Sequence, residues 1–242
     1  MKIIVAPAKT MKPKLNAVKP TELLFESKTD KLHQYLSKFS IEELHDLMKI
    51  SFKLSSQVYD YYHDDNPLMT PALYCYQGTV FKQLSLNSYQ KDDFDYLDEH
   101  LAILSAYYGV LKYHTGIYPY RLDMTMKLDF DLYSFWHDPV KEYFSNDDYI
   151  ISLASKEFNK MVEHPNIINI DFVERKSDRL VRNSMRVKQA RGKMLEAMVK
   201  QKITTFEQLK ALIVDDYIYQ EELSTKNNLV FLRDSLKVYQ KL

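Results

Sequence analysis

Short runs of apolar residues recur along the chain and are separated by polar or proline-containing stretches. Runs of about four to eight such residues are typical of β-strands, and continuous apolar character indicates a strand buried on both faces. We therefore expect strands at residues 2–5, 73–77, 149–153, 167–174, 180–187 and 229–232. The fourth and fifth of these form a predicted hairpin around residues 176–179.

Apolar residues at helical spacing lie between these runs. Ser40, followed three residues later by Glu43, matches a capping box, and apolar positions continue from there at helical spacing. Thr204 with Glu207 has the same pattern and predicts the start of a last helix. We expect helices at about residues 40–59, 92–107, 155–164, 187–198 and 204–213.

The predicted strands and helices follow one another without a strict alternating rhythm. The sequence contains no internal repeat, no low-complexity tract and no linker-like segment. A mixture of this kind predicts one compact α+β domain over residues 1–242, with a mixed sheet and helices around it.

Composition narrows the class of protein. The single cysteine, Cys75, excludes an internal disulfide and lies in an apolar run, so we expect a buried core residue. Pro7 interrupts the first apolar run, which is too short for a signal peptide, and no run approaches the roughly 20 apolar residues of a membrane span. These features predict a cytoplasmic protein with no membrane association.

Charge is unevenly distributed, although the chain has 33 basic and 33 acidic residues. Residues 175–202 contain ten cations and two acids, a net charge of +8, whereas the remainder carries −8. The cations of this segment are Arg175, Lys176, Arg179, Arg182, Arg186, Lys188, Arg191, Lys193, Lys200 and Lys202. A dense basic run of this kind favours a polyanion such as DNA, or else is a solvated face.

Within the basic run, the predicted strand places Arg182, Ser184 and Arg186 on one face. Lys188 and Arg191 follow one turn apart at the start of the next predicted helix, and Gly192 allows a phosphate or another backbone to approach closely.

Two further cations lie outside the basic run. Lys9 follows the first predicted strand, but the residues around it lack the glycines of a P-loop, so it is either a cation of a cleft or an ordinary surface lysine. Arg121, flanked by aromatic residues, either stacks on a base or pairs with Asp123, and the ion pair is the favoured interpretation.

Sites for metals or nucleophilic catalysis are not indicated. The histidines of His63-Asp64-Asp65 and His137-Asp138 are isolated, and the chain has no Gly-x-Ser-x-Gly elbow. We therefore predict no catalytic residue, no metal and no cofactor.

Several motifs, in order along the chain, resemble those of the peroxide stress protein YaaA family. They are Ala6-Pro7-Ala8-Lys9-Thr10, Leu47-Met48-Lys49-Ile50-Ser51 with Lys53-Leu54, Leu104-Ser105-Ala106-Tyr107-Tyr108-Gly109-Val110-Leu111, Pro119-Tyr120-Arg121-Leu122-Asp123-Met124, Leu132-Tyr133-Ser134-Phe135-Trp136, Ile151-Ser152-Leu153-Ala154-Ser155 and Lys188-Gln189-Ala190-Arg191-Gly192. Ala6 and Ala106 depart from the family's Ser and Gly, and the missing hydroxyl weakens any mechanism that depends on it.

The resemblance implies a bacterial cytosolic protein that protects against hydrogen peroxide, partly by limiting free intracellular iron that damages DNA. It also implies a family-specific α+β fold with a basic cleft, a helix-hairpin-helix-like element and duplex DNA binding. Carried over by position, the resemblance further implies that Lys9, Thr10, Lys53, Arg121, Lys188 and Arg191 line this cleft.

The leading hypothesis is therefore a non-catalytic DNA-binding protein of the peroxide stress response, with double-stranded or partly unpaired DNA as its partner and no obligate protein partner. Its expected DNA-binding residues are Lys9, Thr10, Lys53, Arg121, Arg179, Arg182, Arg186, Lys188, Arg191 and Lys193. One alternative is an enzyme that acts on nucleic acid or a nucleotide in the same cleft, which would need a buried acid or nucleophile near Lys9. Another is an iron-handling protein.

Overall fold

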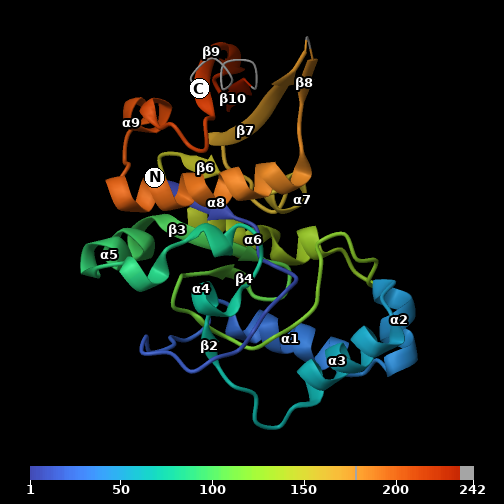
Figure 1. The fold of residues 1–242 in the computed structure, drawn as a ribbon. Helices are drawn as coiled ribbons and strands as arrows, with labels where there is room; N and C mark the ends of the chain where they lie inside the picture. Colours follow the sequence, from blue (N-terminus) through green and yellow to red (C-terminus); the bar gives the residue numbers. More distant parts are fainter. Residues whose placement is uncertain (178, 235–242) are drawn as a thin grey trace.

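A mixed β-sheet forms the centre of the computed structural model, which describes residues 1–177 and 179–234 (Figure 1). Eight strands of the described chain pair in the order β4-β3-β1-β6-β7-β10-β9, with β8 paired to β7. Strands β3, β1, β6, β7 and β10 run parallel to one another, whereas β4, β8 and β9 pair antiparallel with β3, β7 and β10, respectively. Their bounds are β1 Lys2–Val5, β3 Leu101–Ser105, β4 Gly109–Leu111, β6 Ile150–Ser152, β7 Ile167–Lys176, β8 Arg179–Val181, β9 Ile218–Thr225 and β10 Asn228–Asp234.

Helices surround this sheet. In Figure 1, α8 crosses the middle of the molecule, with α1–α3 at one end and β9 and β10 at the opposite end. The helices are α1 Glu26–Leu36, α2 Ile41–Met48, α3 Phe52–His63, α4 Ala72–Cys75, α5 Lys91–His100, α6 Leu132–Phe144, α7 Lys156–Asn159, α8 Ser184–Gln201 and α9 Phe206–Ala211. Short 3₁₀ turns at Phe81–Gln83 and Leu86–Ser88, and a small pair of strands, β2 Thr70–Pro71 and β5 Gly116–Ile117, complete the fold.

The core lies on both faces of the parallel strands. Every residue of β3 and of β6 is buried, which explains why both strands are apolar except for their last residue, Ser105 and Ser152. Trp136 of α6 is fully buried and donates its indole N–H to the Ala106 carbonyl at 2.8 Å. The structure thus confirms the predicted α+β class and mixed sheet. Among the described residues, no helix has both the length and the apolar character needed to cross a membrane.

Two predicted elements have a different structure. Residues 72–75 form one helical turn rather than a strand, because a four-residue apolar run is equally compatible with both when it is buried all round. The helix predicted over 92–107 ends at His100, and Leu101–Ser105 becomes the central strand β3. The apolar residues of this segment fit helical spacing, but Leu101–Ser105 is buried on both faces, which favours a strand.

Side-chain caps explain two further differences. The predicted strand 180–187 ends at Val181 because the Asn183 side chain accepts hydrogen bonds from the backbone of Met185 and Arg186, which starts α8. Arg182 and Arg186 therefore do not share a strand face. Asp178, in the expected turn, lies outside the described residues.

The helix expected over 40–59 is a helical hairpin. Its first half keeps the predicted capping box, and Lys49 then adopts a left-handed conformation with φ of 51° that ends α2. The Ser51 side chain accepts a hydrogen bond from Leu54 at 3.3 Å and starts α3. The last predicted cap shifts by one residue, to Thr205 with Gln208.

Candidate functional site

A cavity of about 400 Å³ opens where the chain leaves the carboxyl ends of β1 and β6. We call it the switch-point pocket, because β1 connects onward to β3 on one side of the sheet, and β6 lies on the other. Ligands of sheets with parallel strands bind preferentially at such a point. Its lining comprises Ala6, Pro7, Ala8, Lys9, Thr10, Met11, Gly78, Thr79, Val80, Phe81, Tyr120, Arg121, Leu122, Asp123, Leu153, Ser155, Glu157, Phe158, Lys188 and Arg191.

Two glycines bring the walls of this pocket together. A Cβ at Gly78 would lie 2.6 Å from the Ala8 Cβ, and one at Gly192 would lie 2.3 Å from the Val80 carbonyl oxygen. Helix α8 therefore packs directly on the loop that contains Val80. The sequence predicted that either a phosphate or another backbone segment would lie close to Gly192. In the structure it is the backbone at Val80.

Four cations from three separate parts of the chain line the pocket: Lys9, Arg121, Lys188 and Arg191. The Nε atoms of Arg121 and Arg191 are buried and have no hydrogen-bond partner among the described residues. Burial lowers the pKa of Arg191, an effect that the Asp171 charge partly opposes. A buried N–H donor without a hydrogen-bond partner is energetically costly, and an anion in the pocket would relieve that cost.

Two acids share the pocket with these cations. The Lys9 ammonium lies 2.6 Å from the Asp123 carboxylate, so Asp123 pairs with Lys9 and not, as expected from sequence, with Arg121. Burial raises the pKa of Glu157; the Asp123 charge raises it further, and Lys9 opposes the shift. Glu157 was not anticipated from the sequence. Its position shortly after a buried strand, in the short helix α7 that follows β6, is the available signal, since Lys9 follows β1 at a similar distance along the chain.

The remaining cations of the basic run mostly face acids from other segments. Arg182 binds Asp171 through two nitrogens, the shorter contact being 2.6 Å, and Arg186 lies 2.7 Å from the buried Glu174. The other pairs join Arg175 to Asp234, Lys193 to Asp215, and Lys200 and Lys202 to Asp93. The net charge of the run is therefore largely compensated in the folded protein.

Three of the predicted DNA-binding residues, Arg182, Arg186 and Lys193, are thus engaged in ion pairs away from the pocket. Arg179 on β8 and Lys53 at the start of α3 are exposed and do not line it. By contrast, the structure gathers Lys9, Thr10, Arg121, Lys188 and Arg191 around one cavity.

Other chemistry receives less support. Burial raises the pKa of the Cys75 thiol to about 12, which keeps it protonated, as expected for a core cysteine. Within residues 1–177 and 179–234, no group of three or more His, Cys, Asp or Glu side chains is arranged to hold a metal ion.

Comparison with known proteins gives one family over most of the chain. A family model described as peroxide stress protein YaaA matches residues 1–223. A UPF0246 protein of Fusobacterium nucleatum is 36% identical over an alignment of 245 positions, which covers 96% of this chain and 99% of that protein. UPF0246 proteins of Desulfitobacterium hafniense and Lachnoclostridium phytofermentans are each 33% identical, covering 96% and 98% of this chain and 98% of each relative.

Proposed function

The chain belongs to the family described as peroxide stress protein YaaA, and from this membership we propose that it acts in the peroxide stress response by binding DNA. The switch-point pocket then holds backbone phosphates. Phosphate contacts carry most of the affinity of proteins that bind DNA without strong sequence preference. By covering the DNA, the protein would protect it from radicals that free iron generates from peroxide.

The observation that supports this proposal is the pair of unpartnered guanidinium nitrogens, Arg121 Nε and Arg191 Nε, in one pocket. Guanidinium groups bind phosphate oxygens through directed, charge-assisted hydrogen bonds. Lys188, which is exposed at the same pocket and forms no ion pair with a described residue, adds a further cation. These are the features of a phosphate site.

Fluorescence anisotropy with a labelled DNA duplex, repeated over a range of salt concentrations, tests the proposal. If the three pocket cations outside the Lys9–Asp123 ion pair, namely Arg121, Lys188 and Arg191, contact phosphates, log affinity falls with log salt at a slope of about −2.7. Arg191→Gln should weaken binding and make this slope less negative by about 0.9. Lys91→Gln, an equal charge change at an exposed residue of α5 outside the pocket, is the matched control.

Three outcomes are decisive in this experiment. Weaker DNA binding by Arg191→Gln, together with unchanged DNA affinity of Lys91→Gln, supports phosphate binding in the switch-point pocket. Equal losses in both variants would indicate binding through overall charge only. Affinity that does not change with salt would contradict phosphate binding altogether.

A second candidate function is an enzyme acting on nucleic acid or a nucleotide in the same pocket. It is favoured by the two carboxyl groups that line the pocket with Lys9, those of Asp123 and Glu157, and by the burial that raises the pKa of Glu157. End-labelled DNA and free nucleotides incubated with the protein should then yield products that Glu157→Gln does not form. Unchanged substrates after prolonged incubation with the unaltered protein would contradict this function.

A further inference from the structure

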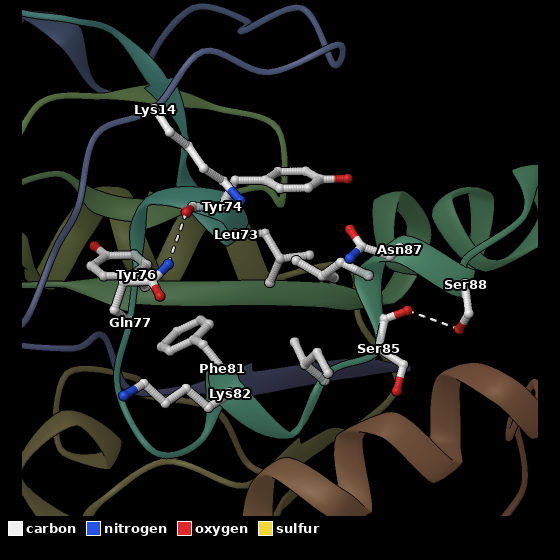
Figure 2. Close-up of a pocket in the computed structure, with 12 residues that line it drawn as sticks. Lys14, Leu73, Tyr74, Tyr76, Gln77, Phe81, Lys82, Ser85, Asn87 and Ser88 are labelled. Atoms are coloured by element: carbon white, nitrogen blue, oxygen red, sulfur yellow. Dashed lines mark hydrogen bonds between the residues drawn. The ribbon is translucent and has the colours of Figure 1, made fainter.

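A second cavity, of about 430 Å³, adjoins the switch-point pocket (Figure 2). We call it the aromatic pocket, and the residues that matter for its chemistry are Tyr74, Tyr76, Gln77, Phe81 and Asn87. Phe81 lines both cavities, and its ring stacks on Tyr76 with centroids 5.0 Å apart. The loop around Phe81 is therefore a shared wall.

A hydrogen-bonded tyrosine pair also connects the two cavities. The hydroxyl of Tyr76, in the aromatic pocket, lies 2.9 Å from that of Tyr120, in the switch-point pocket. Ser105 of the central strand β3 donates a hydrogen bond to Tyr120 at 2.8 Å. The relative position of the two cavities is thus held by buried side chains anchored on the sheet.

The lining of the aromatic pocket combines ring surfaces with amide groups. The Lys14 ammonium lies over the Tyr74 ring, 5.4 Å from its centre, so one face of this ring already contacts a cation. Gln77 donates a hydrogen bond from Nε2 to the Tyr74 carbonyl at 3.2 Å, which orients its amide and leaves its oxygen available. Figure 2 shows the Asn87 amide directed toward the interior of the pocket, and it has no hydrogen bond to a described residue.

We propose that the aromatic pocket receives one unpaired nucleobase of a DNA strand whose phosphate lies in the switch-point pocket. Aromatic rings stack on the faces of bases, and Asn and Gln amides match the paired donors and acceptors on their edges. The adjacent cations make a nucleotide, rather than an apolar ligand, the class of ligand that fits both cavities. This inference rests on the proposed DNA binding, because phosphate recognition sets the strand beside the pocket.

The consequence is a preference for DNA that already contains an unpaired base. A paired base must first be extruded from the duplex, and the energy required for this weakens binding, whereas a bulged base has already lost its pairing. The protein should therefore bind a duplex with a single-base bulge more tightly than a fully paired duplex of the same length.

Three DNAs test the inference by fluorescence anisotropy: a paired duplex, the same duplex with a one-base bulge, and one with an abasic residue at the bulge. The last two share a backbone and differ only in the base. We expect the unaltered protein to bind the base-containing bulge about tenfold more tightly than the abasic one, since one well-placed amide discriminates bases to this degree. Equal affinity for these two DNAs would overturn the inference.

Asn87→Ala is the diagnostic variant, because Asn87 is exposed and its truncation leaves the core intact. It should abolish the preference for the base-containing bulge and keep the affinity for paired duplex within twofold. Lys188→Gln, at the switch-point pocket, should weaken binding of all three DNAs by the same factor. Equal weakening of all three by Asn87→Ala would refute a base-specific pocket.

Binding of a free mononucleotide separates this inference from the proposed function. Deoxyadenosine 5′-monophosphate is titrated into labelled protein while the side-chain amide NMR signals of Gln77 and Asn87 are followed. Shifts of both signals without any DNA binding would retain the base pocket and reject DNA as the partner. DNA binding without bulge preference and without amide shifts would reject the base pocket alone. If neither DNA nor the nucleotide binds, both proposals fail.

Discussion

The Lys9 ammonium and the Asp123 carboxylate lie 2.6 Å apart, although the two residues are separated by 114 positions in the chain. The ion pair joins the loop after β1 to the loop that contains Arg121, at the switch-point pocket. Asp123 is the more enclosed partner, with 19% of its side chain exposed against 63% for Lys9. Asp123 therefore neutralises Lys9, whose ammonium would otherwise be available to bind a phosphate.

Replacing Asp123 with Asn should therefore tighten DNA binding. The freed Lys9 adds one phosphate contact, so the slope of log affinity against log salt becomes more negative by about 0.9. Lys9→Gln should have the opposite effect, because it leaves the Asp123 charge in the pocket without its partner. Anisotropy titrations at several salt concentrations measure both changes. Weaker binding by Asp123→Asn would show that the pair acts as a unit in recognition.

DNA binding should strengthen as the pH falls, because of Glu157. Burial raises the pKa of this carboxyl above its usual value, so on acidification it takes up a proton before an ordinary glutamate does. Protonation removes a negative charge from the pocket. Glu157→Gln should bind as the protonated form does at every pH and lack this component of the pH dependence, which anisotropy at constant salt measures.

The same carboxyl gives a second, independent measurement. Because its folded-state pKa is raised, ionised Glu157 opposes folding, and the protein loses this part of its stability as the pH rises through that pKa. Glu157→Gln should therefore be the more stable protein at neutral pH, with its advantage vanishing below about pH 4.3, the ordinary glutamate pKa. An advantage that persists unchanged in acid would contradict the burial of an ionisable carboxyl here.

Two neighbouring cations of α8 should have opposite roles. Arg186 pairs with Glu174, which is 2% exposed and also accepts a hydrogen bond from Tyr217 at 3.0 Å. Arg186→Met leaves this buried carboxylate short of a partner, so the free energy of unfolding should fall by about 2 kcal/mol. Lys188→Gln should change it by less than about 0.5 kcal/mol, since Lys188 is exposed.

For DNA affinity we expect the opposite ranking of Arg186 and Lys188, with Lys188 the more important residue. Lys188→Gln weakens it, and Arg186→Met leaves both affinity and salt slope unchanged. Chemical denaturation and anisotropy on the same preparations make the comparison. If the Arg186→Met protein is folded but binds DNA more weakly, Arg186 itself contacts DNA, and the ion-paired cations of the basic run belong to the binding surface.

Gly192→Ala should destabilise the protein, although alanine is the better helix former by about 1 kcal/mol. The added Cβ would lie 2.3 Å from the Val80 carbonyl oxygen, so α8 or the loop at Val80 must move. Such overpacking typically costs about 1–3 kcal/mol. Gln201→Ala, at the exposed end of α8, is the control. Thermal denaturation in which Gly192→Ala unfolds at a higher temperature than the unaltered protein would refute this contact.

Local sequence predicted those elements whose determinants are local. The strand at residues 2–5 and the Ser40 capping box depend on a few adjacent residues, and both are present. Residues 101–105 were assigned to a helix because their partners, β1 and β4, lie elsewhere in the chain. The choice between helix and strand was made there by tertiary burial, which a short apolar pattern does not encode.

The candidate site divides in the same way. Family motifs indicated Lys9, Thr10, Lys53, Arg121, Lys188 and Arg191, and all of these except Lys53 line one cavity. The charge run suggested Arg182, Arg186 and Lys193 as well, but their acidic partners come from β7 and from Asp215. Linear charge density overstates available charge whenever folding brings distant acids to a basic segment.

The central place of β1 in the sheet also bears on how the protein is made. This strand is synthesised well before its hydrogen-bonding neighbours, which are Leu101–Ser105 and Ile150–Ser152. At ordinary translation rates the nascent strand waits roughly 5–20 s for the first of them. Throughout that interval its apolar residues and both of its edges lack their native cover, which makes the emerging chain prone to aggregation.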